Sequence, residues 1–395
     1  MGYSAEHKQF STPREITRKM RGLPMASPEK QKYMLYNNMM YTVASHLVEV
    51  KTGQSFEDFL KERFFQPLGM DSTHLHPPSA KGWADRMASG HQFDKATGNW
   101  SVFDIPYAPE AQGAGSIVTS SADYIKWVQA MLHHQPPISE ASYKALTQPR
   151  ILIDPEDKEL NPFCSHQLYC MGWETYHYRG HQVVIHEGLI DGFGSAHFFL
   201  PGHGFGAVIL GNADGIEQVC WILARELIDA ALDVPVADRP DWAALQAAKL
   251  AKGGDAADPQ DQLKELRAEL SSGERSEKPV PALEGFVGTY SDVGYGVFKV
   301  EIRDGRPFID AMNRGFRCTF AFEHVRTWEE DDEESRDVVT RSSMIAHLRP
   351  LRGSVDEYLA AEFVFVGSDE KAGRMGIALD PDTETIWFDR VREDV

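Results

Sequence analysis

Two short segments carry side chains that can exchange protons with a substrate: Tyr36-Asn37-Asn38 and His186-Glu187-Gly188. Tyrosine and histidine both serve enzymes as general acids or bases. Each segment also fits a structural role, because Tyr36 precedes a predicted helix, asparagine at Asn38 is a favoured N-cap residue, and His186 falls at a predicted strand. Taken alone, the two segments leave proton transfer and simple packing both open.

Other candidate groups point away from metal chemistry. The histidines His74, His76, His133 and His134 follow no ligand spacing typical of zinc, and the four cysteines form no CxxC pair. We therefore predict neither a metal nor another cofactor. The tripeptide Lys51-Thr52-Gly53 directly follows a predicted helix, so we interpret its glycine as a helix stop rather than as part of a site.

The elements that must position these residues alternate between helices and strands. Apolar spacing and capping residues predict helices over 34–50, 56–65, 121–132 and 219–232. Strands are predicted over 182–185, 195–200 and 205–210, and the Pro- and Gly-rich stretch 74–104 is predicted to be irregular. The pattern indicates an α+β fold, in which a helical layer lies against an antiparallel sheet.

The composition changes after residue 234. Residues 235–281 are rich in Ala, Asp, Lys and Gly and are interpreted as a linker with a helical piece over 260–270. Strands are then predicted over 285–290, 297–302, 308–311, 316–322, 344–348, 361–366 and 385–388. We therefore expect a first domain over 1–234, the linker, and a small all-β, barrel-like domain over 282–395.

The overall charge limits the classes of partner. The chain has 395 residues and a formal net charge of −19, and its pI is about 5.2. Nucleic-acid binders need a basic face, and an anionic membrane is disfavoured for the same reason, so the expected partner is a small-molecule substrate. Because no stretch approaches ~18 apolar residues and residues 1–21 lack the apolar core of a signal peptide, we expect a cytoplasmic protein. The oligomeric state stays open.

Several further motifs follow the tyrosine triplet in a characteristic order. They are Thr52-Gly53, Phe65-Gln66-Pro67-Leu68-Gly69-Met70-Asp71-Ser72-Thr73, Gln112-Gly113-Ala114-Gly115-Ser116 with Asp123, Met171-Gly172-Trp173, the histidine triplet, Gly192-Phe193 and Gly211-Asn212. This order is similar to that of the β-lactamase-related family, which includes class C β-lactamases, D-aminopeptidases, serine esterases and acyltransferases. The similarity covers roughly residues 20–232, and the tail from about residue 283 looks like the small β-barrel domain that some members append.

The resemblance implies acyl transfer through a covalent acyl-serine. It implies that Tyr36 shuttles a proton to the leaving group, made easier to deprotonate by burial and cationic neighbours. It gives Asn38 hydrogen bonds to a lysine and to the substrate amide, and it places His186 in the lining of the site. Gly188 would leave room for substrate along the strand, and the N–H of Leu189 would form half of an oxyanion hole.

The nucleophile is the part of the family pattern that is not recognisable. The family has a Ser-x-x-Lys motif well upstream of Tyr-x-Asn, whereas only 35 residues precede Tyr36. Ser27-Pro28-Glu29-Lys30 matches the spacing but lies close to Tyr36, so Ser27 is a weak candidate. Ser368-Asp369-Glu370-Lys371 follows a glycine and is interpreted as a turn. Residues 12–24 resemble the region after the family's serine helix, so we expect an incomplete family sequence; a pseudoenzyme or a replaced nucleophile are the alternatives.

Two functions of different classes follow. The first is a serine hydrolase or acyltransferase that acts on a small amide, ester or D-amino-acid-type substrate. The second is a catalytically inactive protein of the same fold that binds or acts as a scaffold. A fold of this kind supports many chemistries, so the fold alone does not fix the substrate.

Overall fold

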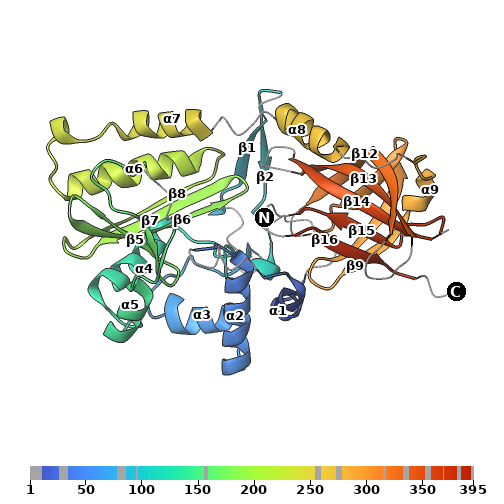
Figure 1. Cartoon of the computed structure of the whole chain (residues 1–395). Coiled ribbons are helices and arrows are strands. Elements are labelled where there is room, and N and C mark those ends of the chain that lie inside the picture. The colour runs from blue at the N-terminus through green and yellow to red at the C-terminus, as the bar shows by residue number, and fades with distance from the viewer. Residues whose placement is uncertain are drawn as a thin grey trace. The chain divides into compact units, whose positions relative to one another are not determined.

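The computed structural model describes residues 11–25, 34–77, 86–94, 97–105, 107–154, 159–253, 259–272, 278–314, 317–331, 338–351, 357–367, 369–379 and 384–392. The chain divides into two compact units (Figure 1). One comprises Ser11–Arg14 and Pro28–Gly253, and the other comprises Met1–Phe10, Glu15–Ser27 and Gly254–Val395. Within the described part of the chain, no helix has the length and apolar character needed to cross a membrane.

The first unit is built on a six-stranded antiparallel sheet whose strands pair in chain order. The strands are β3 (Ile151–Leu152), β4 (Leu168–Tyr169), β5 (Glu174–Tyr178), β6 (His181–Ile190), β7 (Phe193–Leu200) and β8 (Phe205–Gly211). The strands predicted over 182–185, 195–200 and 205–210 are confirmed as β6, β7 and β8. Strand β6 continues past its predicted end, so His186 and Gly188 both lie within it.

Seven helices and four shorter helical turns lie among the described residues up to residue 253. They are α1 (Pro13–Lys19), η1 (Met20–Gly22), α2 (Asn38–Thr52), α3 (Phe56–Leu60), the π-helical turn η3 (Lys61–Phe65), η6 (Pro109–Ala111), α4 (Ser121–His133), α5 (Glu140–Thr147), α6 (Ile216–Ala231), η7 (Val236–Asp238) and α7 (Trp242–Gly253). Ser55 caps α3 by accepting the backbone N–H of Asp58 at 3.1 Å. The helix stop predicted at Gly53 is confirmed, because its φ of 70° ends α2 in the left-handed conformation.

Helices pack on both faces of the sheet because successive strand side chains point to opposite faces. Val184 of β6 packs in a core with Met131 of α4. The next residue, Ile185, packs in a separate core with Ile228 of α6 and Trp242 of α7. Figure 1 accordingly shows α4 and α5 on one side of β5–β8 and α6 and α7 on the other. The α+β fold predicted from the sequence is confirmed.

Helix α2 docks through a polar face. Its buried residues are Thr42 and Ser45. Thr42 Oγ1 donates to the Glu110 carbonyl oxygen at 2.7 Å, and Gln112 Nε2 donates to Ser45 Oγ at 3.2 Å. The apolar residues at helical spacing do not form the buried face, since Leu47 is 55% exposed.

The segment that follows η6 packs directly against the backbone of α2. A Cβ on Gly113 would stand 2.0 Å from the Tyr41 carbonyl oxygen, so only glycine permits this approach. The contact places the first turn of α2, and with it the Tyr36 segment, against the loop that contains Gly113.

The prediction that 74–104 is irregular is wrong for a hairpin. Strand β1 (Gly90–Asp94) pairs antiparallel with β2 (Asn99–Phe103). Phe93 and Trp100 face each other across the hairpin with ring centroids 5.2 Å apart. The strands were not predicted because they are short and the hairpin leaves Trp100 half exposed, which gives no alternating buried pattern to read.

The second unit contains a closed eight-stranded antiparallel barrel with the order β10-β11-β12-β13-β14-β15-β16-β9. The strands are β9 (Gly288–Asp292), β10 (Gly296–Arg303), β11 (Arg306–Ala311), β12 (Cys318–Asp331), β13 (Val338–Pro350), β14 (Glu357–Val366), β15 (Arg374–Ile377) and β16 (Ile386–Arg390). Aromatic side chains fill the interior, among them Tyr290, Phe363 and Phe388, which are fully buried. The all-β, barrel-like architecture predicted for this part of the chain is confirmed.

Two local predictions in this unit are wrong. Residues 285–290 were predicted as one strand, but α9 (Leu283–Phe286) precedes β9 there. Strand β15 was missed because it has four residues, one of them Gly376, and carries no run of β-branched side chains. The helical piece predicted within 235–281 is α8 (Pro259–Ser271), and α7 also lies in that segment.

Candidate active site

Tyr36 lies just before α2, and Asn37 caps that helix. Asn37 Oδ1 accepts the backbone N–H of Met39 at 2.8 Å and that of Met40 at 3.3 Å. Asn37 has the extended backbone of an N-cap, with φ −145° and ψ 110°, whereas Asn38 is the first helical residue. The interpretation of Asn38 as the N-cap is therefore wrong by one position. The Tyr36 side chain is 53% exposed.

Three rings meet at this point. The Tyr36 and His186 ring centroids are 6.4 Å apart, and Tyr169 of β4 lies 6.2 Å from Tyr36 and 6.1 Å from His186. The structure therefore brings Tyr36 and His186 side by side, although 149 positions separate them in the sequence, and it adds Tyr169 to the group.

The environment of His186 keeps its imidazole neutral. Its Nδ1 lies 2.6 Å from the backbone oxygen of Glu187, so Nδ1–H donates there and Nε2 carries the free lone pair. Burial lowers the pKa of His186, and the Glu187 carbonyl and carboxylate oppose this only in part. A neutral histidine with an accepting Nε2 can take a proton from a nucleophile or from water.

The phenols of the site are held in their protonated form. Burial raises the pKa of Tyr36, and Tyr41 and Glu174 raise it further. Burial also raises the pKa of Tyr169, whose hydroxyl shares a short hydrogen bond with that of Tyr41. The expectation that cationic neighbours make Tyr36 easier to deprotonate is not met by the described residues, because no cation is among the groups that shift its pKa. As the site stands, the Tyr36 phenol keeps its proton at neutral pH.

A second histidine, His197, packs against His186. The rings of His186 and His197 of β7 stack with centroids 6.3 Å apart, since the two residues pair directly across β6 and β7. Tyr124 and Trp173 each lie 4.9 Å from the His197 ring. Burial, with a further contribution from His186, lowers the pKa of His197 to about 3. His197 is therefore a neutral wall of the site.

Gly188 and Leu189 extend the site along β6. Gly188 pairs with Ser195 and Leu189 with Gly194. The space next to Gly188 is already occupied, because a Cβ there would stand 2.6 Å from Ser195 Oγ. Gly188 was expected to leave room for substrate, but the Ser195 hydroxyl occupies the space beside it. Leu189 is 63% exposed, so this end of the strand is open to solvent.

The remaining predicted residues are not joined to this cluster. In the described part of the chain, Asn38 makes no hydrogen bond with Tyr36 or His186. Ser27, Lys30 and Ser368 lie outside the described residues, so the predicted nucleophile stays a prediction. No three histidine, cysteine or acidic side chains gather as metal ligands within the described ranges.

The arrangement can donate a proton from a phenol and accept one at an imidazole nitrogen within a single group of rings. Sequence reasoning missed Tyr41, Tyr169 and Glu174 as members of it. The sequence pointed to these residues only through their position close to known motifs: Tyr169 and Glu174 flank Met171-Gly172-Trp173, and Tyr41 follows the triplet at Tyr36. A tyrosine in a two-residue strand such as β4 has no recognisable pattern of its own.

Comparisons with known proteins place the chain among related sequences. The family model described as Beta-lactamase matches residues 2–229. The unguisins hydrolase of Aspergillus violaceofuscus is 33% identical over 254 residues, covering 59% of this chain and 44% of that protein. The corresponding protein of Aspergillus campestris is 33% identical over 231 residues, covering 58% and 42%. The chain thus spans less than half the length of these relatives.

The fold is also similar to a solved structure. The octameric penicillin-binding protein homologue of Pyrococcus abyssi superimposes with a TM-score of 0.50 over 95% of this chain and 70% of that chain, at 18% sequence identity. At this identity the likeness concerns the fold and not the activity.

Proposed function

The chain belongs to the Beta-lactamase family, and on that premise we propose that it is a serine hydrolase or acyltransferase acting on a small amide, ester or peptide through an acyl-serine. The observation that carries the proposal is the Tyr36–His186 pair, a protonated phenol beside a neutral imidazole within the part of the chain that the family model matches. The relatives with 33% identity are named as hydrolases, which supports the same reaction class.

In the proposed reaction, a serine oxygen bonds to the substrate carbonyl carbon while His186 Nε2 accepts the serine proton. The bond from that carbon to the leaving nitrogen or oxygen then breaks, and the leaving atom takes the Tyr36 hydroxyl proton, so Tyr36 is the general acid. The serine proton then passes from His186 to the Tyr36 phenolate and restores its hydroxyl. The N–H of Leu189 and the side chain of Asn38 are assigned to the substrate carbonyl and amide.

The acyl-serine is then hydrolysed. Water attacks the acyl carbon as His186 Nε2 accepts its proton, and that proton returns to the serine oxygen when the acyl–oxygen bond breaks. The lowered pKa of His186 suits this step, because the imidazole is unprotonated and ready to accept at neutral pH. The serine nucleophile is not identified in this chain, and Ser27 is a weak candidate for it.

Labelling with a fluorophosphonate, followed by intact-mass measurement and peptide mapping, tests the proposal. We expect one adduct per chain, peptide mapping identifies the serine that carries it, and Ser27→Ala tests the weak candidate. Tyr36→Phe should slow labelling by about 10²-fold, in line with the loss of a positioned proton-transfer group, while Tyr358→Phe in the barrel should label at the original rate. An adduct on another serine would reassign the nucleophile, and labelling that is indifferent to Tyr36 would refute the proposed role of that residue.

The raised pKa of Tyr36, with no cation among the described groups that shift it, favours a second candidate function. Here the chain binds small amides without turnover. This candidate predicts no covalent adduct with the fluorophosphonate, yet a rise in melting temperature with a D-amino-acid amide, since a ligand that binds only the folded state stabilises it. An adduct that forms and turns over would exclude this second candidate.

A further inference from the structure

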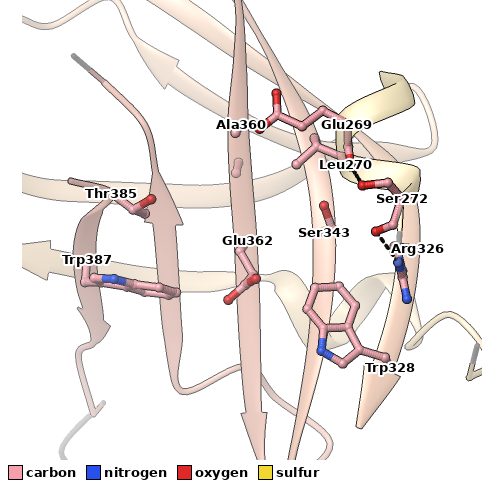
Figure 2. A pocket seen from close by; sticks show the side chains of 11 residues that line it. Glu269, Leu270, Ser272, Arg326, Trp328, Ser343, Ala360, Glu362, Thr385 and Trp387 are labelled. Carbon is pink, nitrogen blue, oxygen red and sulfur yellow. Dashed lines mark hydrogen bonds between the residues drawn. The ribbon is translucent and has the colours of Figure 1, made fainter. Parts of the chain in front are cut away.

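The second unit contains a cavity that shares no lining residue with the proposed active site. It has a volume of about 600 Å³ and is bounded by the end of α8 and by the outer face of the barrel. The lining residues are Glu269, Leu270, Ser272, Arg326, Trp328, Ser343, Ala360, Ala361, Glu362, Thr385 and Trp387 (Figure 2). A volume of this size is typical of small-molecule sites.

Two tryptophans form the walls of the cavity and small residues its floor. Trp328 lies on β12 and Trp387 on β16, with β13, β14 and β15 between them. The intervening strands present Ser343 and Ala360 to the cavity. On β15 the Trp387 ring lies directly over Gly376, where a Cβ would stand 3.0 Å from it. The Arg374 guanidinium lies 4.9 Å from the Trp387 ring centroid, so a ring-shaped ligand in the hollow would lie against the part of the indole that neither Arg374 nor Gly376 covers.

Glu362 is held in a fixed position between these walls. In Figure 2 its carboxylate lies between the two indoles. Arg341 forms ion pairs with both Glu362 and Glu330, and Trp328 Nε1 donates to Glu330 Oε2 at 3.2 Å. The chain of contacts from Trp328 to Glu362 orders one wall and the central polar group together, which lowers the side-chain entropy that the protein loses when a ligand binds.

A second polar group lines the same cavity. Arg326 is 7% exposed, its Nη1 donates to the Ser272 carbonyl oxygen at 2.8 Å, and its guanidinium lies 5.1 Å from the Trp328 ring. The lining carries the Arg326 guanidinium and the carboxylates of Glu269 and Glu362, and Glu362 is paired with Arg341, so the charges around the cavity largely offset one another. A purely apolar ligand would shield the side chains of Arg326, Glu362 and Ser343 from water and offer them no hydrogen bond in return, which is unfavourable.

We propose that this cavity is a binding site for a neutral carbohydrate, with one pyranose ring stacked on an indole and its hydroxyls hydrogen-bonded to Glu362, Arg326 and Ser343. A pyranose has polar edges and two less polar C–H faces, and an aromatic ring offers a negative face to such hydrogens. A peptide fits less well, because a closed barrel has no free strand edge for a peptide to pair with. The inference is independent of the proposed hydrolase activity.

The test is titration of the full chain with cellobiose, maltose and N,N′-diacetylchitobiose, followed by calorimetry and tryptophan fluorescence. We expect at least one sugar to bind with a Kd near the millimolar range and to change the tryptophan emission. Trp387→Ala should weaken that binding about tenfold, as expected for loss of an aromatic stacking contact, whereas Trp387→Phe should keep most of it. Trp100→Ala is the matched control, because Trp100 is an exposed tryptophan of the other unit.

Two results would overturn the inference. One is the absence of heat and of any emission change with all three sugars up to about 20 mM. The other is equal sugar affinity in the original chain and in Trp387→Ala, since unchanged binding would show that the barrel is folded and that Trp387 takes no part. Binding of a neutral aromatic tripeptide amide that depends on Trp387, with no sugar bound, would assign the cavity to peptides and would also refute the carbohydrate assignment. None of these measurements depends on hydrolysis.

Discussion

Asp123 is the point at which the first unit should be most sensitive to loss of one carboxylate. The residue is 5% exposed in the first turn of α4. Its Oδ2 accepts the Ser72 backbone N–H at 2.6 Å and the Thr73 hydroxyl at 3.1 Å. Its Oδ1 accepts Lys126 Nζ at 2.9 Å. These bonds tie the 65–73 motif to α4.

The magnitude follows from what each donor loses in Asp123→Ala. The Ser72 N–H loses a hydrogen bond to a charged group, which contributes about 1.5–3 kcal/mol. Thr73 keeps its bond to Thr119 Oγ1 at 2.8 Å and adds less than about 1 kcal/mol. The Lys126 side chain is 40% exposed, so this ion pair also adds less than about 1 kcal/mol. We expect a loss of about 3–4 kcal/mol in Asp123→Ala, and about half of that in Asp123→Asn, which keeps an accepting oxygen.

The effect should depend on pH. Burial raises the pKa of Asp123, but the hydrogen bonds from Lys126, Ser72 and Thr73 outweigh burial and lower it. A carboxyl with a lowered folded-state pKa stabilises the protein above its unfolded pKa of about 3.9, and that stabilisation is lost as the pH falls through the folded-state pKa. The difference between the original chain and Asp123→Asn should therefore hold from pH 7 to about pH 4 and shrink below it.

Urea denaturation followed by near-ultraviolet circular dichroism measures the free energy, and hydrogen exchange at the Ser72 amide reports the local bond. Asp58→Asn is the control, because Asp58 is an exposed carboxylate at the first turn of α3 and accepts a side-chain bond only from the Ser55 hydroxyl. The reasoning would be refuted if Asp123→Ala shifted the unfolding free energy no more than Asp58→Asn, or left exchange at Ser72 unchanged.

Three further outcomes are expected. Gly113→Ala should lower the unfolding free energy by more than about 2 kcal/mol, because its Cβ meets the Tyr41 carbonyl oxygen; thermal unfolding checks this. His197→Gln should flatten the rise of stability with pH between about 3 and 6.5. In this range the unfolded state of the original chain binds a proton at His197 that the folded state does not bind. The slope is measured by unfolding at several pH values. Asp229→Asn should cost about 2–4 kcal/mol, because the fully buried carboxylate accepts two buried donors and the amide can serve only one of them; a urea midpoint shift tests it.

How far the sequence predicts this fold depends on how local each signal is. Ser55 and Gly53 cap their helices by contacts within a few residues, so their roles could be read directly from residue type. The strands β6, β7 and β8 could be read from apolar runs bounded by turns. The docking of α2 could not, because it buries Thr42 and Ser45 against Glu110 and Gln112, and these partners are more than 60 positions away.

The candidate site shows the same limit. The resemblance selected Tyr36 and His186, and the structure puts their rings together. Tyr169 joins them from a two-residue strand, and the electrostatic effect of Glu174 on Tyr36 depends on the sheet register, which no local pattern encodes. The direction of the Tyr36 pKa shift likewise required the burial and the neighbours of the folded chain.

The most direct test of the central claim is a double-mutant cycle on the rate of fluorophosphonate labelling, with Tyr36→Phe, His186→Gln and both together. If the two rings act in one site, the losses should be strongly non-additive, and the double variant should label about as slowly as the slower single variant. Losses that simply add, or a labelling rate that neither substitution changes, would contradict the account.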